Sequence, residues 1–261
     1  MERSNIEKIA SNYDDKVLLA KLWDKITAGM NRNIPAFTCF LSPREQEMAR
    51  FLFGETEGLF SFGGFPDAER KMLCYLPDYM DEECLMQEGS PVVCLRATFY
   101  EGDTLSHRDF LGALMGAGIG RETVGDICVG TGYCDFFVTE EIAPYLLQSF
   151  TSAGRTKLSL AQIPLQDAKI PVAQVKIMQD TLASLRLDSV VSAGFRISRS
   201  LAAQAISAGK VTVDALPCEK PDKSIAAGCK ISLRGSGKMK LEKINGQTKK
   251  GRISVEIHRY L

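Results

Sequence analysis

The chain is poor in the residues that hold metals and cofactors. It has only two histidines, His107 and His258, and none of its eight cysteines belongs to a Cys-x-x-Cys pair. Structural zinc sites need ligands paired roughly two to four residues apart, so no metal is expected. Three cysteines lie among apolar neighbours, in Leu73-Cys-Tyr, Val93-Cys-Leu and Ile127-Cys-Val. We predict that these are small core residues, kept reduced in a cytosol.

Long apolar runs and enzyme motifs are also missing. The most apolar stretch, residues 111–120, is about half as long as a membrane span, and residues 1–8 lack the apolar core of a signal peptide. Gly116-Ala-Gly-Ile-Gly-Arg resembles a dinucleotide-binding loop, but it follows a helical pattern instead of linking a strand to a helix. There is no Gly-x-Ser-x-Gly and no P-loop. We therefore expect a cytoplasmic protein without cofactor, membrane contact or catalytic residues.

The formal net charge is zero, but the charge is unevenly distributed along the chain. Residues 1–154 hold 13 Lys and Arg against 24 Asp and Glu, whereas residues 155–261 hold 19 against 8. A basic end on an acidic body suits a protein that binds a polyanion at one end only. Nucleic acid is the first candidate, because its phosphates attract Lys and Arg whatever the base sequence. The alternative is that the basic charges only keep the protein soluble.

The first 85 residues are predicted to form an acidic α+β domain. Apolar positions at helical spacing predict a helix over residues 13–30. Ser42 and Glu45, with Pro43 between them, predict a capping box at the start of a second helix that runs to about Phe53. Residues 59–62 and 71–76 are expected to be strands on either side of Gly63-Gly-Phe-Pro-Asp-Ala-Glu-Arg.

Residues 86–164 are predicted to form a ferredoxin-like domain. Their pattern gives the order β-α-β-β-α-β, which many RNA-recognition domains share. The aromatic-rich strand motif of base stacking is absent. Phe136 and Phe137 alternate on one strand, so we expect one in the core and only the other to be able to stack. Whether this domain contacts RNA or is only structural stays open. Residues 165–184 are expected to be a connector that contains a possible strand.

The last module, residues 185–261, contains two short helices followed by strands. The first helix is predicted to end near Gly194, and the second to begin at its N-cap Ser198 and end at Gly209. Leu201 is expected on the inner face of the second helix, together with Ala202, Ala205 and Ile206. The strands are expected over residues 230–234, 239–244 and 252–258. The whole chain is thus predicted to be an α+β protein of three small domains.

Basic residues surround the start of the second helix of this module. Arg196 and Arg199 flank its N-terminus, where free backbone N–H groups and the helix dipole already favour an anion. A guanidinium matches phosphate oxygens in a fork, so a phosphate-binding site is predicted. Arg186 either joins this site or pairs with Asp188 as a structural ion pair, and the sequence leaves both open.

The predicted RNA-binding residues fall into a primary and a secondary set. The primary set lies on or beside the two helices: Arg186, Arg196, Ser198, Arg199, Ser200, Gln204 and Lys210. The secondary set lies in the basic tail: Lys238, Lys240, Lys249, Lys250 and Arg252. Some of the tail charges are expected only to improve solubility and to discourage strand-edge aggregation.

Four short segments of this module together resemble the S4 RNA-binding domain. They are Arg186-Leu-Asp, Ser198-Arg-Ser, Gly209-Lys-Val and Gly228-Cys-Lys-Ile-Ser. The sequence departs from the usual pattern at Asp214-Ala215, where Asn-Gly is usual, and at Cys229, where Asp is usual. Both departures lie in turns, so they question the local turn geometry more than the RNA contact.

The resemblance extends beyond the S4 module to the YlmH family of bacterial S4 proteins. It rests on Phe37-Thr-Cys-Phe-Leu-Ser-Pro-Arg-Glu-Gln, Gly63-Gly-Phe-Pro-Asp-Ala-Glu-Arg, the segment that begins at Arg108-Asp-Phe-Leu-Gly-Ala, and Thr248-Lys-Lys-Gly-Arg-Ile. The resemblance implies binding to structured RNA on the large ribosomal subunit, in ribosome-associated quality control, with rRNA as the first ligand and tRNA as the second. DNA is not expected as a partner.

Two other classes of function stay open. S4 modules are often attached to RNA-modifying enzymes, and Asp188 could suggest the nucleophile of a pseudouridine synthase. This aspartate lies inside the S4 pattern itself, so we interpret it as structural. The third class is an adaptor, whose acidic N-terminal domain would bind a protein partner.

Overall fold

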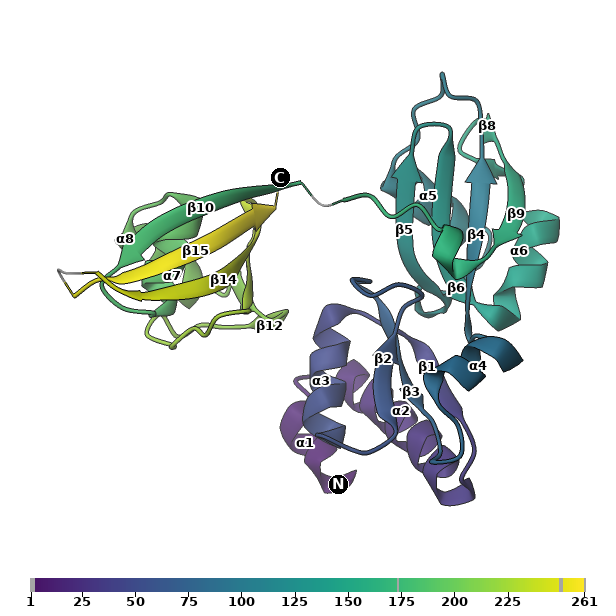
Figure 1. Ribbon diagram of the computed structural model, residues 1–261, viewed down its shortest axis with the longest axis horizontal. Coiled ribbons are helices and arrows are strands. Elements are labelled where there is room, and N and C mark those ends of the chain that lie inside the picture. Colours follow the sequence, from purple (N-terminus) through teal and green to yellow (C-terminus); the bar gives the residue numbers. More distant parts are fainter. Residues whose placement is uncertain (1–2, 173, 249–250, 261) are drawn as a thin grey trace. The chain divides into compact units, whose positions relative to one another are not determined.

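The computed structural model describes residues 3–172, 174–248 and 251–260. The chain divides into two compact units, Met1–Pro171 and Val172–Leu261, which Figure 1 shows in one view. The three-domain division predicted from the sequence, with its limits at residues 85, 164 and 184, stays a prediction.

The N-terminal part of the first unit is a three-stranded antiparallel sheet packed with helices. Its elements are η1 Arg3–Asn5, α1 Ile6–Ile9, α2 Tyr13–Arg32, β1 Ala36–Leu41, α3 Pro43–Phe53, β2 Leu59–Phe62, β3 Lys71–Tyr75 and α4 Glu82–Glu88. The strand order is β1-β3-β2. Ser42 and Glu45 form the predicted capping box of α3, with Pro43 at its first position. The predicted helices and strands of this part are confirmed.

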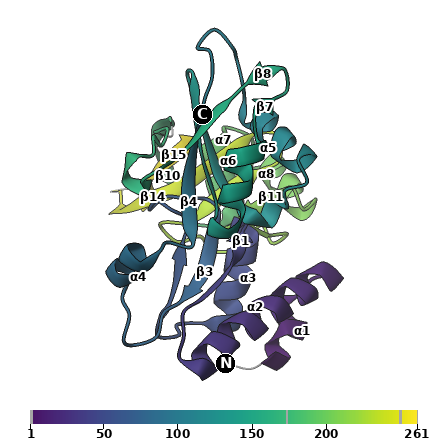
Figure 2. The ribbon, with the colours of Figure 1, turned by 90° about the vertical axis from the view of Figure 1, so that its right-hand side faces the viewer.

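The rest of the first unit is a four-stranded antiparallel sheet with two main helices. Its elements are β4 Val92–Thr98, α5 His107–Gly116, η2 Arg121–Thr123, β5 Val124–Gly130, β6 Tyr133–Thr139, η3 Glu140–Ile142, α6 Ala143–Ser149, β7 Ser152–Ala153, β8 Thr156–Lys157, β9 Ser159–Ile163 and η4 Leu165–Asp167. The sheet order β5-β6-β4-β9 is that of the ferredoxin-like arrangement, so the predicted order is confirmed. Both α5 and α6 pack on the same face of this sheet (Figure 2).

The opposite face of the central sheet is partly covered by the N-terminal sheet. Phe136 points to the helices and Phe137 to the N-terminal part, and both are fully buried. The Phe137 ring lies 5.0 Å from that of Phe65 and packs in one cluster with Phe40. The expectation that one of these phenylalanines is available to stack on a base is therefore wrong, because a second sheet fills the space that a base would need.

A loop of the N-terminal part holds the two sheets together. The backbone N–H groups of Glu69 and Arg70 donate to the Asp126 carboxylate, at 2.6 and 3.0 Å. The Arg70 guanidinium donates to the carbonyls of Phe40, Arg121 and Val124. The segment that ends at Arg70 and the segment around Arg121 thus meet at an internal contact of the first unit.

The second unit is a six-stranded antiparallel sheet with two helices on one face. Its elements are β10 Val175–Leu182, α7 Leu187–Phe195, α8 Arg199–Ser207, β11 Val211–Val213, β12 Leu216–Pro217, β13 Lys230–Leu233, β14 Gly237–Gln247 and β15 Ile253–Tyr260. The sheet order is β10-β15-β14-β13-β11-β12. β10 pairs along its whole length with β15, so residues 175–182, expected within a connector, form the edge strand of this sheet.

Candidate nucleic-acid interface

The turn between α7 and α8 places the predicted RNA-binding residues. Gly194 allows α7 to lie close to the sheet, because a Cβ at this position would lie 1.9 Å from the Met239 sulfur. Arg196 ends α7 in the left-handed conformation, at φ 55°. The Ser192 hydroxyl donates to the Ile197 carbonyl at 2.7 Å and holds the turn. Ser198 then caps α8, with its side chain accepting from the Leu201 N–H.

Asp188 is the centre of this region. It is buried, at 4% exposure, and it lies in the first turn of α7. Its carboxylate accepts from the Arg186 guanidinium at 3.3 and 3.0 Å, and from the Arg199 guanidinium at 3.2 and 3.1 Å. The two arginine side chains stay 42% and 54% exposed. One buried carboxylate therefore holds two half-exposed guanidinium groups from two different helix ends.

The ionisation of Asp188 follows from these contacts. Burial alone would raise the pKa of this carboxyl, but the hydrogen bonds and the positive charges of Arg186 and Arg199 outweigh it. The pKa of Asp188 therefore lies below its usual range, and the side chain is charged at neutral pH. The two guanidinium groups carry one positive charge more than Asp188 offsets, and the exposed Asp222 lies near enough to Arg186 to help raise the pKa of that guanidinium.

Each arginine keeps donors for an external anion. Arg186 uses its Nε and one terminal nitrogen on Asp188, and Arg199 uses one terminal nitrogen. A guanidinium has five N–H donors, so both can still bind an oxyanion. The nearby N-terminus of α8 adds backbone N–H groups and the positive end of the helix dipole. This arrangement can bind a phosphate without recognising a base.

The other primary residues lie around this cluster or farther along α8. Arg196 is exposed and forms no ion pair with the residues that the structure describes. The Ser198 and Ser200 hydroxyls lie 3.0 Å apart at the helix start. Gln204 is exposed on α8, and Lys210 is exposed just after it. The assignment of all seven residues to RNA contact stays a prediction.

One side chain of α8 does not follow the predicted pattern. Leu201 was expected on the inner face, but it is 54% exposed, whereas Ala202 and Ile206 are fully buried. The helix has only nine residues, so helical spacing alone does not fix where its buried stripe begins. Leu201 is therefore an exposed apolar side chain in the first turn of α8.

Lys238 and Lys240 of the secondary set lie on a different side of this unit from the primary set. Met239 and Leu241 of β14 are buried with α7 and α8, so their neighbours Lys238 and Lys240 point to the opposite face of the sheet. Lys240 pairs with Glu242 at 2.8 Å, and Arg252 donates to Thr181 on β10. Lys249 and Lys250 lie outside the described residues. A single flat RNA surface cannot contact the primary set together with Lys238 and Lys240.

Sequence reasoning missed that Asp188 holds Arg199 as well as Arg186. The Arg-Leu-Asp segment was a signal for the nearer pair, but Arg199 is eleven residues away and reaches the carboxylate only through the α7–α8 turn. Aspartate at the second position of a helix is ordinary, so its double role could not be predicted from spacing.

Other chemistry in the described part of the chain is sparse. No group of three or more His, Cys, Asp or Glu side chains there is placed to hold a metal ion. None of the described helices combines the length and apolar character that a membrane crossing requires. The cysteines predicted to be in the core, Cys74, Cys94 and Cys128, are buried, and burial raises the pKa of each thiol to about 12.

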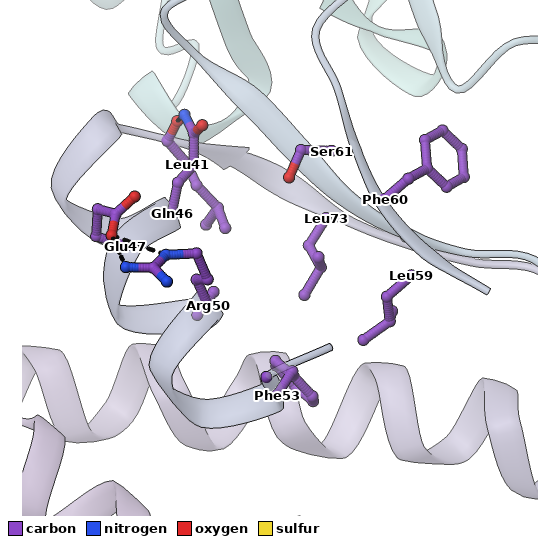
Figure 3. Close-up of a pocket in the computed structure, with 11 residues that line it drawn as sticks. Leu41, Gln46, Glu47, Arg50, Phe53, Leu59, Phe60, Ser61 and Leu73 are labelled. Carbon is purple, nitrogen blue, oxygen red and sulfur yellow. Dashed lines mark hydrogen bonds and ion pairs between the residues drawn. The ribbon is translucent and has the colours of Figure 1, made fainter. Parts of the chain in front are cut away.

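A shallow pocket of about 210 Å³ lies in the N-terminal part, between α3 and the strands β2 and β3 (Figure 3). Its walls are mainly apolar and include Phe53, Leu59 and Leu73. At its rim, Arg50 is engaged by Glu47 at 2.7 Å. This charged pair is a local contact within one helix and does not form a nucleophile–base arrangement.

The second unit has the architecture of an S4 domain. Two helices joined by a basic turn pack on one antiparallel sheet. The S4 family model matches residues 185–228, and a model described as "Putative RNA-binding domain in YlmH" matches residues 100–167. The chain is 36% identical over 224 residues to ribosome-associated protein quality control protein P2 of Bacillus subtilis. The alignment covers 85% of this chain and 86% of that protein. The chain belongs to the YlmH family of RNA-binding proteins.

A solved structure agrees with this assignment at the level of fold. Cell division protein ylmH from Streptococcus pneumoniae aligns with a TM-score of 0.51 and 21% identity, over 62% of this chain and 98% of that chain. The resemblance to S4 domains and to the YlmH family that was drawn from the sequence is confirmed.

Proposed function

We propose that this protein is a non-catalytic, cytoplasmic RNA-binding factor that acts on the large ribosomal subunit in ribosome-associated quality control. The name of the Bacillus subtilis relative supports the association with ribosomes and with quality control. The proposed ligand is structured rRNA, with tRNA as a second RNA that such a site could contact. The protein would recognise the backbone of a folded RNA and not a base sequence.

The observation that carries this proposal is the arginine pair held by Asp188. The carboxylate fixes two guanidinium groups next to the start of α8, while about half of each side chain stays exposed. Ordered arginines lose less side-chain entropy on binding than free ones, and their forks match phosphate oxygens. Arg196, Ser198, Ser200, Gln204 and Lys210 are proposed to extend this contact along α8.

The structure also bears on the rival enzyme hypothesis. An aspartate nucleophile must reach its substrate, but Asp188 is 4% exposed and accepts hydrogen bonds from two arginines and from the Ser189 hydroxyl. This environment supports a positioning role for Asp188. It favours a binding protein over a pseudouridine synthase whose nucleophile would be this residue.

Sedimentation of a cell lysate through a sucrose gradient tests the proposal. At low salt, the native chain should migrate with the large subunit, and an Arg196→Glu/Arg199→Glu variant should stay near the top. A Lys238→Glu/Lys240→Glu variant is the matched control, since it reverses the same charge on the opposite face of the sheet, and it should still migrate with the subunit.

Two other outcomes are informative. If only the control variant is lost from the subunit, the RNA contact lies on the sheet face and not at the helices. If the native chain itself stays at the top, the ribosomal proposal fails, and the enzyme and adaptor hypotheses become the leading ones.

A further inference from the structure

The central sheet of the first unit keeps one open strip on the face opposite its helices. Directly paired residues place Ser159, Thr98, Tyr133 and Gly130 in one row across the four strands. Paired residues point to the same face of a sheet. Thr98 and Ser159 are exposed, whereas Phe137, two rows away, is buried beneath the N-terminal sheet. The face is therefore closed at one end and open at the row of Tyr133.

Tyr133 lies along this face instead of pointing away from it. Its ring passes over Gly130 on the neighbouring strand, where a Cβ would lie only 2.2 Å from the tyrosine Cζ and 2.4 Å from Cε1. Gly130 does not have a positive φ, so its backbone conformation does not require glycine. The missing side chain matters because it leaves room for a flat aromatic ring on the sheet.

Two cations lie over the Tyr133 ring. The Lys169 Nζ is 4.6 Å and the Arg96 Cζ is 5.6 Å from the ring centroid. Arg96 is fixed by two hydrogen bonds of 2.6 Å to Asp135, a fully buried carboxylate that also accepts the Lys169 backbone N–H at 2.7 Å. The buried negative charge is matched by Arg96, so the ammonium of Lys169 remains as the added positive charge beside the ring.

We propose that Tyr133 is a stacking platform for one unpaired RNA base, with the Lys169 ammonium binding the adjacent phosphate. An aromatic ring beside a cation suits single-stranded RNA, because any base can stack and every nucleotide carries a phosphate. A base-paired nucleotide does not fit, because its faces are already covered by its neighbours in the helix. The flexible Lys169 side chain, nearer to the ring centroid, can move off the ring, and the base would then stack beside Arg96, which Asp135 holds in place.

This proposal rests on RNA binding by the chain, but it concerns a second site, in the first unit and apart from the arginines of α7 and α8. One tyrosine offers space for one base, since the next residue of the same strand on this face is Asp135, which is buried and engaged by Arg96. The site is therefore expected to bind a short unpaired segment with little preference for base sequence.

Binding of a fluorescein-labelled eight-nucleotide oligouridine, followed by fluorescence anisotropy at low salt, tests the platform. The full chain is used with Arg196→Glu/Arg199→Glu, so that the proposed helix site does not mask the second one. In this background, Tyr133→Ala should weaken binding roughly tenfold, because one stacked base is lost. Tyr133→Phe keeps the ring and should bind within about twofold of the parent.

Two further variants separate stacking from a structural role. Gly130→Ala leaves Tyr133 in the chain but displaces its ring, so it should weaken binding several-fold. Tyr145→Ala removes a tyrosine that is 48% exposed on α6, on the other side of the sheet, and should leave binding unchanged. Equal binding by Tyr133→Ala and its parent, or equal loss in the alanine and phenylalanine variants, would overturn the platform.

A photochemical experiment on the native chain places the site directly. An oligouridine containing 5-bromouridine should form an adduct on the peptide that holds Tyr133 when it is irradiated in the complex. Adducts found only within residues 172–261 would exclude the platform while leaving the α7–α8 site intact. Failure of the ribosomal proposal would instead appear in the gradient and leave this adduct unaffected.

Discussion

Asp188 shows how a single buried carboxylate can order two half-exposed arginines. Replacing it by Asn keeps the size of the side chain but removes the charge that holds Arg186 and Arg199. We expect Asp188→Asn to lower the free energy of unfolding of the second unit by about 2 kcal/mol at pH 7, less than for a fully buried pair because both arginines are half exposed. Calorimetry of the full chain measures this loss.

The same residue predicts a pH dependence with a definite sign. Because the pKa of Asp188 is lowered in the folded chain, its stabilising effect is complete above the ordinary aspartate pKa and is lost as pH falls through the folded value. The difference in stability between native and Asp188→Asn proteins should thus be constant from pH 8 to about 5 and shrink below about pH 4. A difference that grows toward acid pH would contradict this assignment.

Asp214 and Ala215 make a strained turn. Both have a positive φ, 47° and 64°, which Asn-Gly adopts at little cost and alanine does not. The departure from the usual S4 pattern has therefore kept the turn geometry and added strain. Ala215→Gly should raise the free energy of unfolding by about 1 kcal/mol. Ala208→Gly is the control, since φ there is −83°, and it should give no gain.

At the scale of elements, a helix or strand could be predicted from the sequence where the contact that stabilises it lies within a few residues. The α3 capping box spans four residues, and Ser198 caps a helix that begins with the next residue, so both could be predicted from the sequence. β10 is different, because its partner β15 follows more than seventy residues later, and only a possible strand could be predicted. The burial of Phe137 depends on contact with the N-terminal sheet, so it could not be predicted from the residue pattern of its own strand.

The Arg70 guanidinium links the N-terminal sheet of the first unit to its central part. Arg70→Ala removes the donor from the carbonyls of Phe40, Arg121 and Val124. We expect the free energy of unfolding to fall by about 2–4 kcal/mol, because the carbonyls of Phe40 and Arg121 lose this donor and the Val124 carbonyl keeps only its bond from the Arg121 guanidinium. Fluorescence of Trp23, the single tryptophan, measures it in a urea titration.

The matched control for this prediction is Arg50→Ala on α3. The Arg50 side chain is 64% exposed in its ion pair with Glu47, so loss of this pair should cost less than about 0.5 kcal/mol. Equal effects of the two substitutions would mean that Arg70 acts only through its charge and does not hold the N-terminal and central sheets together.

At the scale of the whole molecule, charge is divided between the two units. Residues 1–171 hold 16 Lys and Arg against 25 Asp and Glu, whereas residues 172–261 hold 16 against 7. RNA should therefore be attracted to the second unit and repelled by most of the first, except where local cations outweigh the acidic background, as at Tyr133. Such a division orients the chain on a polyanion before any specific contact forms.

Salt dependence tests this picture, because each phosphate that the protein neutralises releases counterions from the RNA. If about five phosphates are contacted, log affinity for a structured RNA should fall with log salt at a slope of roughly −4. Arg196→Glu/Arg199→Glu should reduce the size of this slope by about two and weaken binding to different RNA sequences alike, since phosphate contacts position a protein without specifying bases.

The matched control is Lys238→Glu/Lys240→Glu, on the opposite face, which should leave the slope nearly unchanged. A slope near zero in the native chain would mean that the basic unit does not bind RNA through its phosphates, and an unchanged slope in the arginine variant would place the contact elsewhere on that unit.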